Sequence, residues 1–245
     1  MNKLPIIDFS NFKPQTPTWD SVKIQVMKAR KNMVVLRLYS MKYLLISRKS
    51  IIDRSQLLFD LPLQNKLRNR SDKPYQGYIG QYPMVPLYES LGIEDAVFRV
   101  QKYDAPKSQE TKIGLTSHTD KNIVTILYGN EVKGLEVLTK DSNWINAEPS
   151  MNSFIVMIGD FFHAWTNGRM HSAHHRVTMA GDEARYSFGL FSIPKSAYII
   201  KAPKEMVDEE HPLLFKPYDH LKLMEFYYIG AGRSSPNTLK TYCGA

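Results

Sequence analysis

The chain has 245 residues, and its 43% apolar and 23% charged content excludes a collagen-like, coiled-coil or wholly disordered protein. Lys and Arg exceed Asp and Glu by 32 to 24, a net charge of +8 that first suggests nucleic acid or an anionic membrane as a partner. The single cysteine, Cys243, cannot form an internal disulfide, which is typical of a reducing compartment.

No run of the sequence is long and apolar enough for a membrane span. The most apolar run near the N-terminus, residues 33–46, contains Arg37 and Lys42. As a helix it would cover only about 21 Å, against roughly 30 Å of hydrocarbon. An acid and a proline occur within the first eight residues, too early for a signal peptide. We therefore expect a cytoplasmic protein with no membrane partner.

The first 95 residues mix helix and strand signals. Residues 4–9 are typical of a short strand, and residues 18–29 place apolar side chains at helical spacing. Residues 51–67 also predict a helix, with a break at Pro62 because proline interrupts helical hydrogen bonding. Residues 71–87 are rich in Pro, Gly and Tyr and predict a loop.

From Phe98 onward, short apolar or alternating runs recur, each bounded by turn residues. The eight runs are residues 98–102, 123–128, 134–138, 144–146, 154–158, 175–180, 186–191 and 198–201. Short strands at this spacing predict a mainly β protein with flanking helices, either a sandwich or a barrel, for which a jelly roll is the natural candidate. The tail, from about residue 205, is typical of loop and helix.

All seven histidines lie in the predicted β-rich region after Phe98 or in the tail, and the first belongs to an H-x-D motif formed by His118 and Asp120. Alternate residues of a strand share a face, so a ring nitrogen and a carboxylate oxygen would converge there, as a metal site requires. Alone the motif is weakly specific, because a surface histidine beside a turn aspartate has the same pattern.

A second histidine motif places His174 and His175 side by side at the start of a predicted strand. Adjacent strand residues face opposite sides, so only one of the two can join His118 and Asp120. Two histidines and one carboxylate, with open positions opposite, form the facial triad of non-haem Fe(II) oxygenases. Zinc in a hydrolase uses the same ligand types, so the motif alone leaves both sites open.

Arg185 and Ser187 follow on the next predicted strand, where they share a face. A guanidinium beside a hydroxyl matches a carboxylate, which arginine binds through two parallel hydrogen bonds. The ordinary alternative is an arginine on the surface of a strand. A buried arginine beside a metal would instead need an anion, and a dicarboxylate co-substrate would supply it.

The ordered motifs H-x-D, N-G-x-x-x-S-x-x-H-R-V and R-Y-S lie within residues 118–187, between short strands. This stretch resembles the catalytic core of the plant 2-oxoglutarate- and Fe(II)-dependent dioxygenases, in particular the AOP-like branch. Members of that branch modify glucosinolate side chains, and their relatives hydroxylate steroidal glycoalkaloids. The segments LPIIDFSNF near the N-terminus and VDEEHPLLFKPYDH near the C-terminus resemble the same family, so the likeness covers most of the chain.

The resemblance implies an N-terminal region over residues 1–95, a double-stranded β-helix (jelly-roll, cupin-like) core over residues 97–203 and a tail over residues 204–245. It implies that His118, Asp120 and His175 bind iron, that Arg185 and Ser187 bind the distal carboxylate of 2-oxoglutarate, and that Tyr103 contacts the same co-substrate. It further implies that O2 and 2-oxoglutarate oxidise a small plant metabolite with release of succinate, supported by ascorbate. Four residues are candidates for the substrate pocket, although core packing is their commoner role: Tyr82, Met84, Tyr88 and Phe191.

Two stretches depart from the family pattern. Residues 28–54 align only at their ends, and Ala96–Val97 is the predicted junction of an internal deletion that would leave one face of the barrel uncovered. A catalytically inactive, truncated relative is therefore the alternative to an active enzyme. Residues 28–54 also hold eight Lys and Arg and one acid, so they carry +7 of the +8 net charge. Because the remaining chain is nearly neutral, we do not expect nucleic acid as a partner.

Overall fold

The computed structural model describes residues 4–8, 21, 24–26, 35–39, 45–71, 76–93, 98–107, 110–148, 150, 153–194, 198–229, 232 and 235–245, without the side chains of 8, 35–39, 45–49, 93 and 229. Most of the helix predicted over residues 18–29, and the predicted junction at residues 96–97, lie outside the described residues. Within the described ranges, no helix combines the length and the apolar character needed to cross a bilayer.

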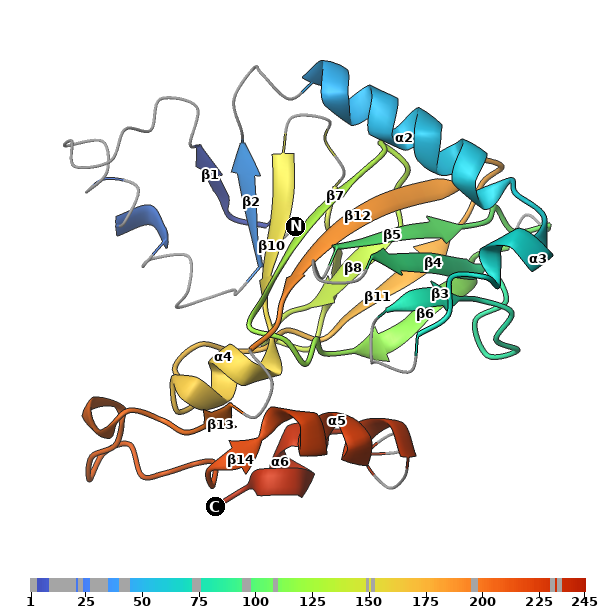
Figure 1. The fold of residues 1–245 in the computed structure, drawn as a ribbon. Coiled ribbons are helices and arrows are strands. Elements are labelled where there is room, and N and C mark those ends of the chain that lie inside the picture. The colour runs from blue at the N-terminus through green and yellow to red at the C-terminus, as the bar shows by residue number, and fades with distance from the viewer. Residues whose placement is uncertain are drawn as a thin grey trace.

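Two sheets face each other and form the body of the molecule (Figure 1). The larger sheet has the strand order β1-β2-β10-β7-β12-β5-β4-β3, and the smaller one has the order β6-β11-β8-β9. The strands of the larger sheet are β1 (Ile6–Asp8), β2 (Val35–Tyr39), β3 (Gly77–Ile79), β4 (Tyr88–Ile93), β5 (Phe98–Tyr103), β7 (Val124–Gly129), β10 (Ser153–Ile158) and β12 (Arg185–Ser192). Those of the smaller sheet are β6 (Lys112–His118), β8 (Leu135–Leu138), β9 (Trp144–Asn146) and β11 (His175–Met179).

Neighbouring strands run antiparallel throughout both sheets, except for the parallel pair β1 and β2. Alternate residues of these strands point into the space between the sheets and form one apolar cluster, which includes Leu127, Val137, Met157 and Val177. The mainly β jelly roll predicted from the recurring short runs is therefore confirmed. Strands β3, β4 and β6 were not among the predicted runs, because glycines, prolines and isolated polar residues interrupt their apolar patterns.

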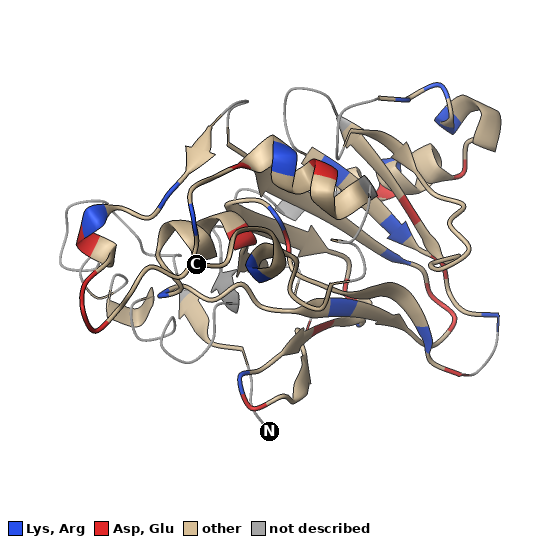
Figure 2. Ribbon diagram, turned by 90° about the horizontal axis from the view of Figure 1, so that it is seen from below, with Lys and Arg blue, Asp and Glu red and all other residues tan. Residues whose placement is uncertain are grey.

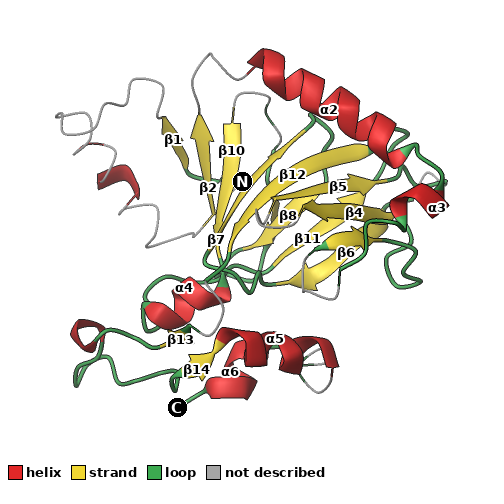
Figure 3. Ribbon diagram, viewed as in Figure 1, coloured by secondary structure: helices red, strands yellow, loops and turns green. Residues whose placement is uncertain are grey.

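Helix α2 (Leu45–Phe59) lies across the outer face of the larger sheet, and the short α3 (Leu63–Lys66) follows it (Figures 1 and 3). The two are separate helices around Pro62, which precedes the first residue of α3, as the sequence predicts. Phe59 packs in a cluster with Tyr128 and Phe188 of the sheet. Farther along the same face, the register partners Ile126 and Leu190 are 37% and 46% exposed, so α2 covers only part of this surface.

The C-terminal segment forms a small unit below the sandwich (Figure 1). It contains β13 (Ile199–Ile200), a 3₁₀ turn (Lys204–Met206), β14 (Tyr218–Asp219), α5 (His220–Ile229) and α6 (Thr238–Cys243). The short helix α4 (Asp160–Trp165) joins this unit to the sandwich, because Phe161 and Ala164 pack against Leu223 and Leu239 in one buried cluster. This docking brings the end of α5 to the mouth of the space between the sheets.

Charged residues are distributed over the whole molecule. Figure 2 shows Lys and Arg interspersed with Asp and Glu along the described ribbon. Two ion pairs are largely buried, Lys66 with Glu89 and Lys121 with Asp160. The first connects α3 to β4, while the second lies beside the histidines considered next.

Candidate active site

His118 and His175 are placed together by the backbone of the smaller sheet. His118 ends β6, His175 begins β11, and the two are register partners in the antiparallel ladder. Asp120 follows β6 by two residues, and its Oδ1 lies 3.8 Å from Nε2 of His118 and 3.7 Å from Nε2 of His175. One ligand atom from each residue lies within 4.8 Å of the other two, which suits a single metal ion. The predicted convergence of His118 and Asp120 is confirmed, although the strand ends at His118 and Asp120 lies in the segment that follows it.

Hydrogen bonds fix the orientation of all three side chains. Nδ1 of His118 donates to the carbonyl of Thr116 at 2.8 Å, and Nδ1 of His175 donates to the carbonyl of Ala173 at 3.2 Å. Because a carbonyl oxygen can only accept, Nδ1 of each histidine carries a proton, and Nε2 of each faces Asp120. Asp120 in turn accepts a hydrogen bond on Oδ2 from Thr125 at 2.5 Å, which leaves Oδ1 for the metal.

Burial sets the charges that this trio carries at neutral pH. Burial, followed by repulsion from His175, lowers the pKa of His118 to about 4. Burial alone would raise the pKa of Asp120, but His175, His118 and the Thr125 hydrogen bond hold it below its usual value. The site thus offers a neutral imidazole at His118 and an ionised carboxylate, the forms that bind a divalent metal.

The turn that carries Asp120 is anchored to neighbouring elements by a buried ion pair. Lys121 contacts Asp160 at 2.8 Å and donates to Oγ1 of Thr119 at 2.8 Å. The backbone N–H of Asp160 donates to the carbonyl of Asp120 at 2.7 Å, so the start of α4 supports the ligand directly. The ring of Tyr227, on α5, lies 5.0 Å from Nζ of Lys121, which connects the turn to the C-terminal unit.

A second polar group lies on the larger sheet, where β12 pairs with β5. Nη1 of Arg185 donates to Oγ of Ser187 at 3.2 Å, and Ser187 donates to Oε1 of Gln101 at the same distance. Arg185 is the register partner of Tyr103, whose ring centroid lies 5.3 Å from the guanidinium carbon. All four side chains are buried. Burial lowers the pKa of Arg185 and raises that of Tyr103, so Tyr103 stays a neutral phenol at neutral pH.

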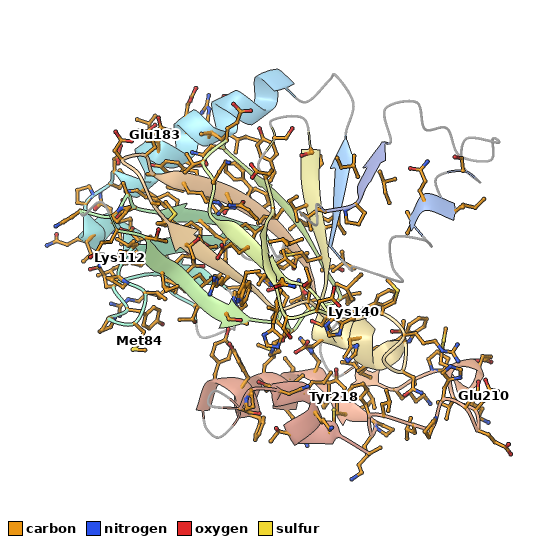
Figure 4. The ribbon with its side chains drawn as sticks, turned by 180° about the vertical axis from the view of Figure 1, so that it is seen from behind. Met84, Lys112, Lys140, Glu183, Glu210 and Tyr218 are labelled. Atoms are coloured by element: carbon orange, nitrogen blue, oxygen red, sulfur yellow. The ribbon has the colours of Figure 1, made fainter. Side chains whose placement is uncertain are left out.

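One cavity of about 720 Å³ connects the histidine site with Arg185 and Ser187. The four side chains proposed from the sequence for a substrate pocket all line it: Tyr82, Met84, Tyr88 and Phe191. In Figure 4, Met84 projects from the loop between β3 and β4 and stands out from the body of the molecule. The lining residues that were not identified from the sequence include Arg99, Gln101, Thr125, Tyr227 and Tyr228. Alternation along β5 could have indicated Arg99 and Gln101, since both share a strand face with Tyr103.

The other histidines lie apart from this site. His174, the neighbour of His175, points to the opposite side, where its Nδ1 lies 3.5 Å from Oγ of Ser117. His163 donates to the carbonyl of Met170, and His211 pairs with Asp208. Within the described part of the chain, no other set of three His, Cys, Asp or Glu side chains comes together in the same way.

Comparison with known proteins identifies the family to which this site belongs. Residues 94–194 match the model of the 2OG-Fe(II) oxygenase superfamily. The chain is 36% identical over 310 residues to the probable 2-oxoglutarate-dependent dioxygenase AOP1.2 of Arabidopsis thaliana, with 98% of this chain and 95% of that protein covered. The chain belongs to the 2OG-Fe(II) oxygenase superfamily. The resemblance to the AOP-like branch is thereby confirmed, and the enzyme class is 2-oxoglutarate-dependent dioxygenase with an intact facial triad.

Solved structures confirm the fold. The rice dioxygenase for auxin oxidation superposes with a TM-score of 0.77 at 23% identity, covering 92% of this chain and 95% of that one. The structure of JOX2 in complex with 2OG, Fe and JA gives the same TM-score at 19% identity, covering 92% and 85%. This chain and both of these structures share the double-stranded β-helix of 2OG-Fe(II) oxygenases, although the sequence identity is low.

This oxygenase is shorter than its Arabidopsis relative. The 98% of this chain that aligns is about 240 of 245 residues, so about 70 of the 310 aligned positions have no residue from this chain. The donors described above nevertheless suit Fe(II), because two imidazoles and a carboxylate on one side of a metal are the ligand set of non-haem iron oxygenases. Fe(II) is accordingly the metal of this oxygenase, and 2-oxoglutarate is its co-substrate.

Proposed function

We propose that this oxygenase hydroxylates, or otherwise oxidises, a small plant specialised metabolite while 2-oxoglutarate is converted to succinate. In this proposal His118, Asp120 and His175 hold the iron. Arg185 binds the distal carboxylate of 2-oxoglutarate, and Ser187 and Tyr103 help to hold the co-substrate in place. The similarity to the AOP1.2 dioxygenase supports a plant metabolite as substrate, and a cavity of about 720 Å³ has the size of a small-molecule site.

The single observation that carries the proposal is the position of two polar groups on the same cavity. The trio of His118, Asp120 and His175 lies on the smaller sheet and its following turn, whereas Arg185 lies on the larger sheet opposite. A diacid that bound a metal at one end would therefore meet a guanidinium at the other. Zinc hydrolysis, the alternative left open by the histidines, gives no role to Arg185 beside Ser187.

The protein residues contribute binding, orientation and exclusion of water. Fe(II), when bound, supplies the redox chemistry that couples oxidative decarboxylation of 2-oxoglutarate to oxidation of the substrate. Nδ1–H hydrogen bonds hold the imidazoles of His118 and His175 in one orientation, and Thr125 holds the carboxylate of Asp120. Arg185 orients the co-substrate, because a guanidinium matches a carboxylate in geometry as well as charge. Ascorbate would serve as the supporting reductant, and the free, buried Cys243 is consistent with a cytoplasmic enzyme.

The test is succinate formation by purified protein with Fe(II), 2-oxoglutarate and ascorbate. We expect His175→Ala to abolish succinate formation, because it removes one of the three metal ligands. His174→Ala is the matched control, since the adjacent side chain points away from the cavity, and it should retain succinate formation. Equal succinate in the wild-type protein and His175→Ala would show that the proposed chemistry is wrong.

A catalytically inactive relative is the second candidate, and two observations favour it. About 70 aligned positions of the AOP1.2 relative have no counterpart here, and Ile126 and Leu190 are exposed on the outer face of the larger sheet. Thermal and urea unfolding with Mn(II) and 2-oxoglutarate separates the candidates, because a ligand at 100 times its Kd stabilises the fold by about 2.7 kcal/mol. Stabilisation without succinate formation would indicate a binding-competent but inactive protein, and no stabilisation at saturation would indicate a lost site.

A further inference from the structure

Gln101 lies at the centre of the polar group on the larger sheet. It is on β5, on the same strand face as Tyr103, and it is the register partner of Ser187 on β12. The side chain is 7% exposed and lines the cavity. A buried amide needs partners for its oxygen and for its N–H groups, and Gln101 finds both kinds of partner within this group.

The amide oxygen of Gln101 takes the proton of the Ser187 hydroxyl. Oγ of Ser187 donates to Oε1 of Gln101 at 3.2 Å and accepts from Nη1 of Arg185 at the same distance. A serine hydroxyl has one proton to donate. In this arrangement Ser187 therefore orients the guanidinium of Arg185 and has no second proton for a carboxylate.

The amide nitrogen of Gln101 has the opposite effect on two tyrosines. Nε2 donates to the hydroxyl oxygens of Tyr88 and Tyr103, at 3.4 Å in each case. Each phenol accepts from the amide and keeps its own proton, for which no acceptor lies among the described residues. Burial raises the pKa of Tyr103, so this proton is retained at neutral pH. The hydroxyl of Tyr103 is thus a buried donor that an acceptor in the cavity would satisfy.

Arg185 and Tyr103 present their donors to the same part of the cavity. They are register partners on β12 and β5, and the guanidinium carbon lies 5.3 Å from the centroid of the tyrosine ring. Both side chains line the cavity. Because the Ser187 proton is directed to Gln101, the donors that remain are N–H groups of Arg185 and the O–H of Tyr103. This pair suits an ionised carboxylate, which only accepts.

We propose that Gln101 is a positioning residue that fixes the direction of this hydrogen-bond chain, so that Arg185 and Tyr103 donate to the distal carboxylate of 2-oxoglutarate. Ser187 then acts through Arg185, and Gln101 acts through Ser187 and Tyr103, without contact with the co-substrate. This inference rests on the proposed function, because it takes the Arg185 group as the site of that carboxylate.

The test compares the Kd of 2-oxoglutarate with that of 2-oxopentanoate, which has the same carbon chain but a methyl group in place of the distal carboxylate. Calorimetry on the full-length protein loaded with Mn(II) measures both, so that no turnover occurs. We expect Gln101→Met to raise the Kd of 2-oxoglutarate by about tenfold, the usual worth of one hydrogen bond to a charged group. The Kd of 2-oxopentanoate should stay unchanged, because it has no group for Arg185 and Tyr103 to bind.

Lys102→Met is the matched control. Lys102 is the next residue of β5, lies on the opposite strand face outside the cavity wall, and pairs with Asp104. The substitution should change neither Kd. A loss of affinity for both acids in Gln101→Met would indicate damage to the sheet in general.

The double variant Gln101→Met with Ser187→Ala tests whether the two residues act as one chain. Because each substitution breaks the same chain, the loss of affinity for 2-oxoglutarate in the double variant should be smaller than the product of the two single losses. An independent contact of either side chain with the co-substrate would instead make the losses multiply.

Three results overturn the proposal: an unchanged Kd of 2-oxoglutarate in Gln101→Met, equal weakening of both acids, or multiplied losses in the double variant. If Gln101→Met fails to fold, Gln101→Asn replaces it. That variant keeps a buried amide but is too short to bridge Ser187 and Tyr103, so the same loss is expected. Failure of the proposed function is seen separately in the wild-type protein, as an absence of any Mn(II)-dependent preference for 2-oxoglutarate over 2-oxopentanoate.

Discussion

His118 and His175 occupy one rung of the ladder between β6 and β11, with their ring centroids 4.3 Å apart. Two of the three proposed iron ligands are thus positioned by strand pairing, which is rigid, whereas Asp120 lies in the turn after β6. The turn depends on side-chain and backbone hydrogen bonds from Thr125 and Asp160. Metal binding should therefore respond most to changes in the residues that hold this turn.

Thr125→Val removes the hydroxyl that donates to Asp120 and keeps the shape of the side chain. We expect the affinity for Mn(II) to fall by about ten- to a hundredfold, the usual effect of losing a residue that orients a metal ligand. Thr125→Ser keeps the hydroxyl and should bind the metal with an affinity near that of the wild-type protein. Metal titration measures both, and equal Kd values for Thr125→Val and the wild-type protein would show that Asp120 is held by other contacts.

Arg185→Lys keeps the positive charge but removes the planar fork that matches a carboxylate. We expect the Kd of 2-oxoglutarate to rise by about ten- to a hundredfold, since a hydrogen bond to a charged group contributes about 1.5–3 kcal/mol. Arg176→Lys is the matched control, because Arg176 also lies on a strand but pairs with Glu136 outside the cavity wall. Calorimetry with Mn(II)-loaded protein compares the two, and unchanged affinity in Arg185→Lys would place the co-substrate elsewhere.

Asp160→Asn removes the carboxylate that pairs with buried Lys121. Breaking a buried pair in this way lowers the free energy of unfolding by about 3–5 kcal/mol. Glu148→Gln, which breaks the exposed pair with Lys133, is the control and should change it by no more than about 1 kcal/mol. Urea unfolding gives both values. If the two substitutions proved equally mild, the pair would not support the turn that carries Asp120.

The sequence was most informative where a chemical motif coincided with a strand end. His118 and His175 could be predicted as neighbours because each motif lay at the edge of a predicted strand and matched a known ligand pattern. Strand alternation predicted that His118 and Asp120 converge, but not that β6 ends at His118, two residues before Asp120. Strand β3 was missed since Gly77 has a φ of +75° and the surrounding glycines and prolines are typical of a loop.

Long-range packing accounts for the site residues that could not be predicted. Tyr227 and Tyr228 lie more than a hundred residues from β6, and they reach the cavity only because α4 docks the C-terminal unit against the sandwich. Figure 4 shows Tyr218 in the C-terminal unit, below the sandwich. Such contacts depend on how elements distant in sequence pack together, which no local pattern records.

His220, the first residue of α5, should make the fold sensitive to mild acid. Burial lowers its pKa below the usual value, although the neighbouring Asp219 acts in the opposite direction. The unfolded chain therefore binds a proton at this position at higher pH than the folded chain does. Stability is full above the unfolded pKa of about 6.5 and decreases as the pH falls through that value. Partial burial lowers the pKa values of His171 and His174 in the same direction, which adds to the effect.

His220→Asn removes the group that takes up a proton on unfolding. The free energy of unfolding should therefore decrease less steeply between about pH 7.5 and 5.5 than it does in the wild-type protein. Urea unfolding at several pH values measures that slope. His211→Asn is the control, because His211 is exposed and pairs with Asp208 at the surface, and it should not flatten the slope. A slope for His220→Asn parallel to that of the wild-type protein would mean that His220 is protonated alike in both states, and that the acid sensitivity of the fold arises at other histidines.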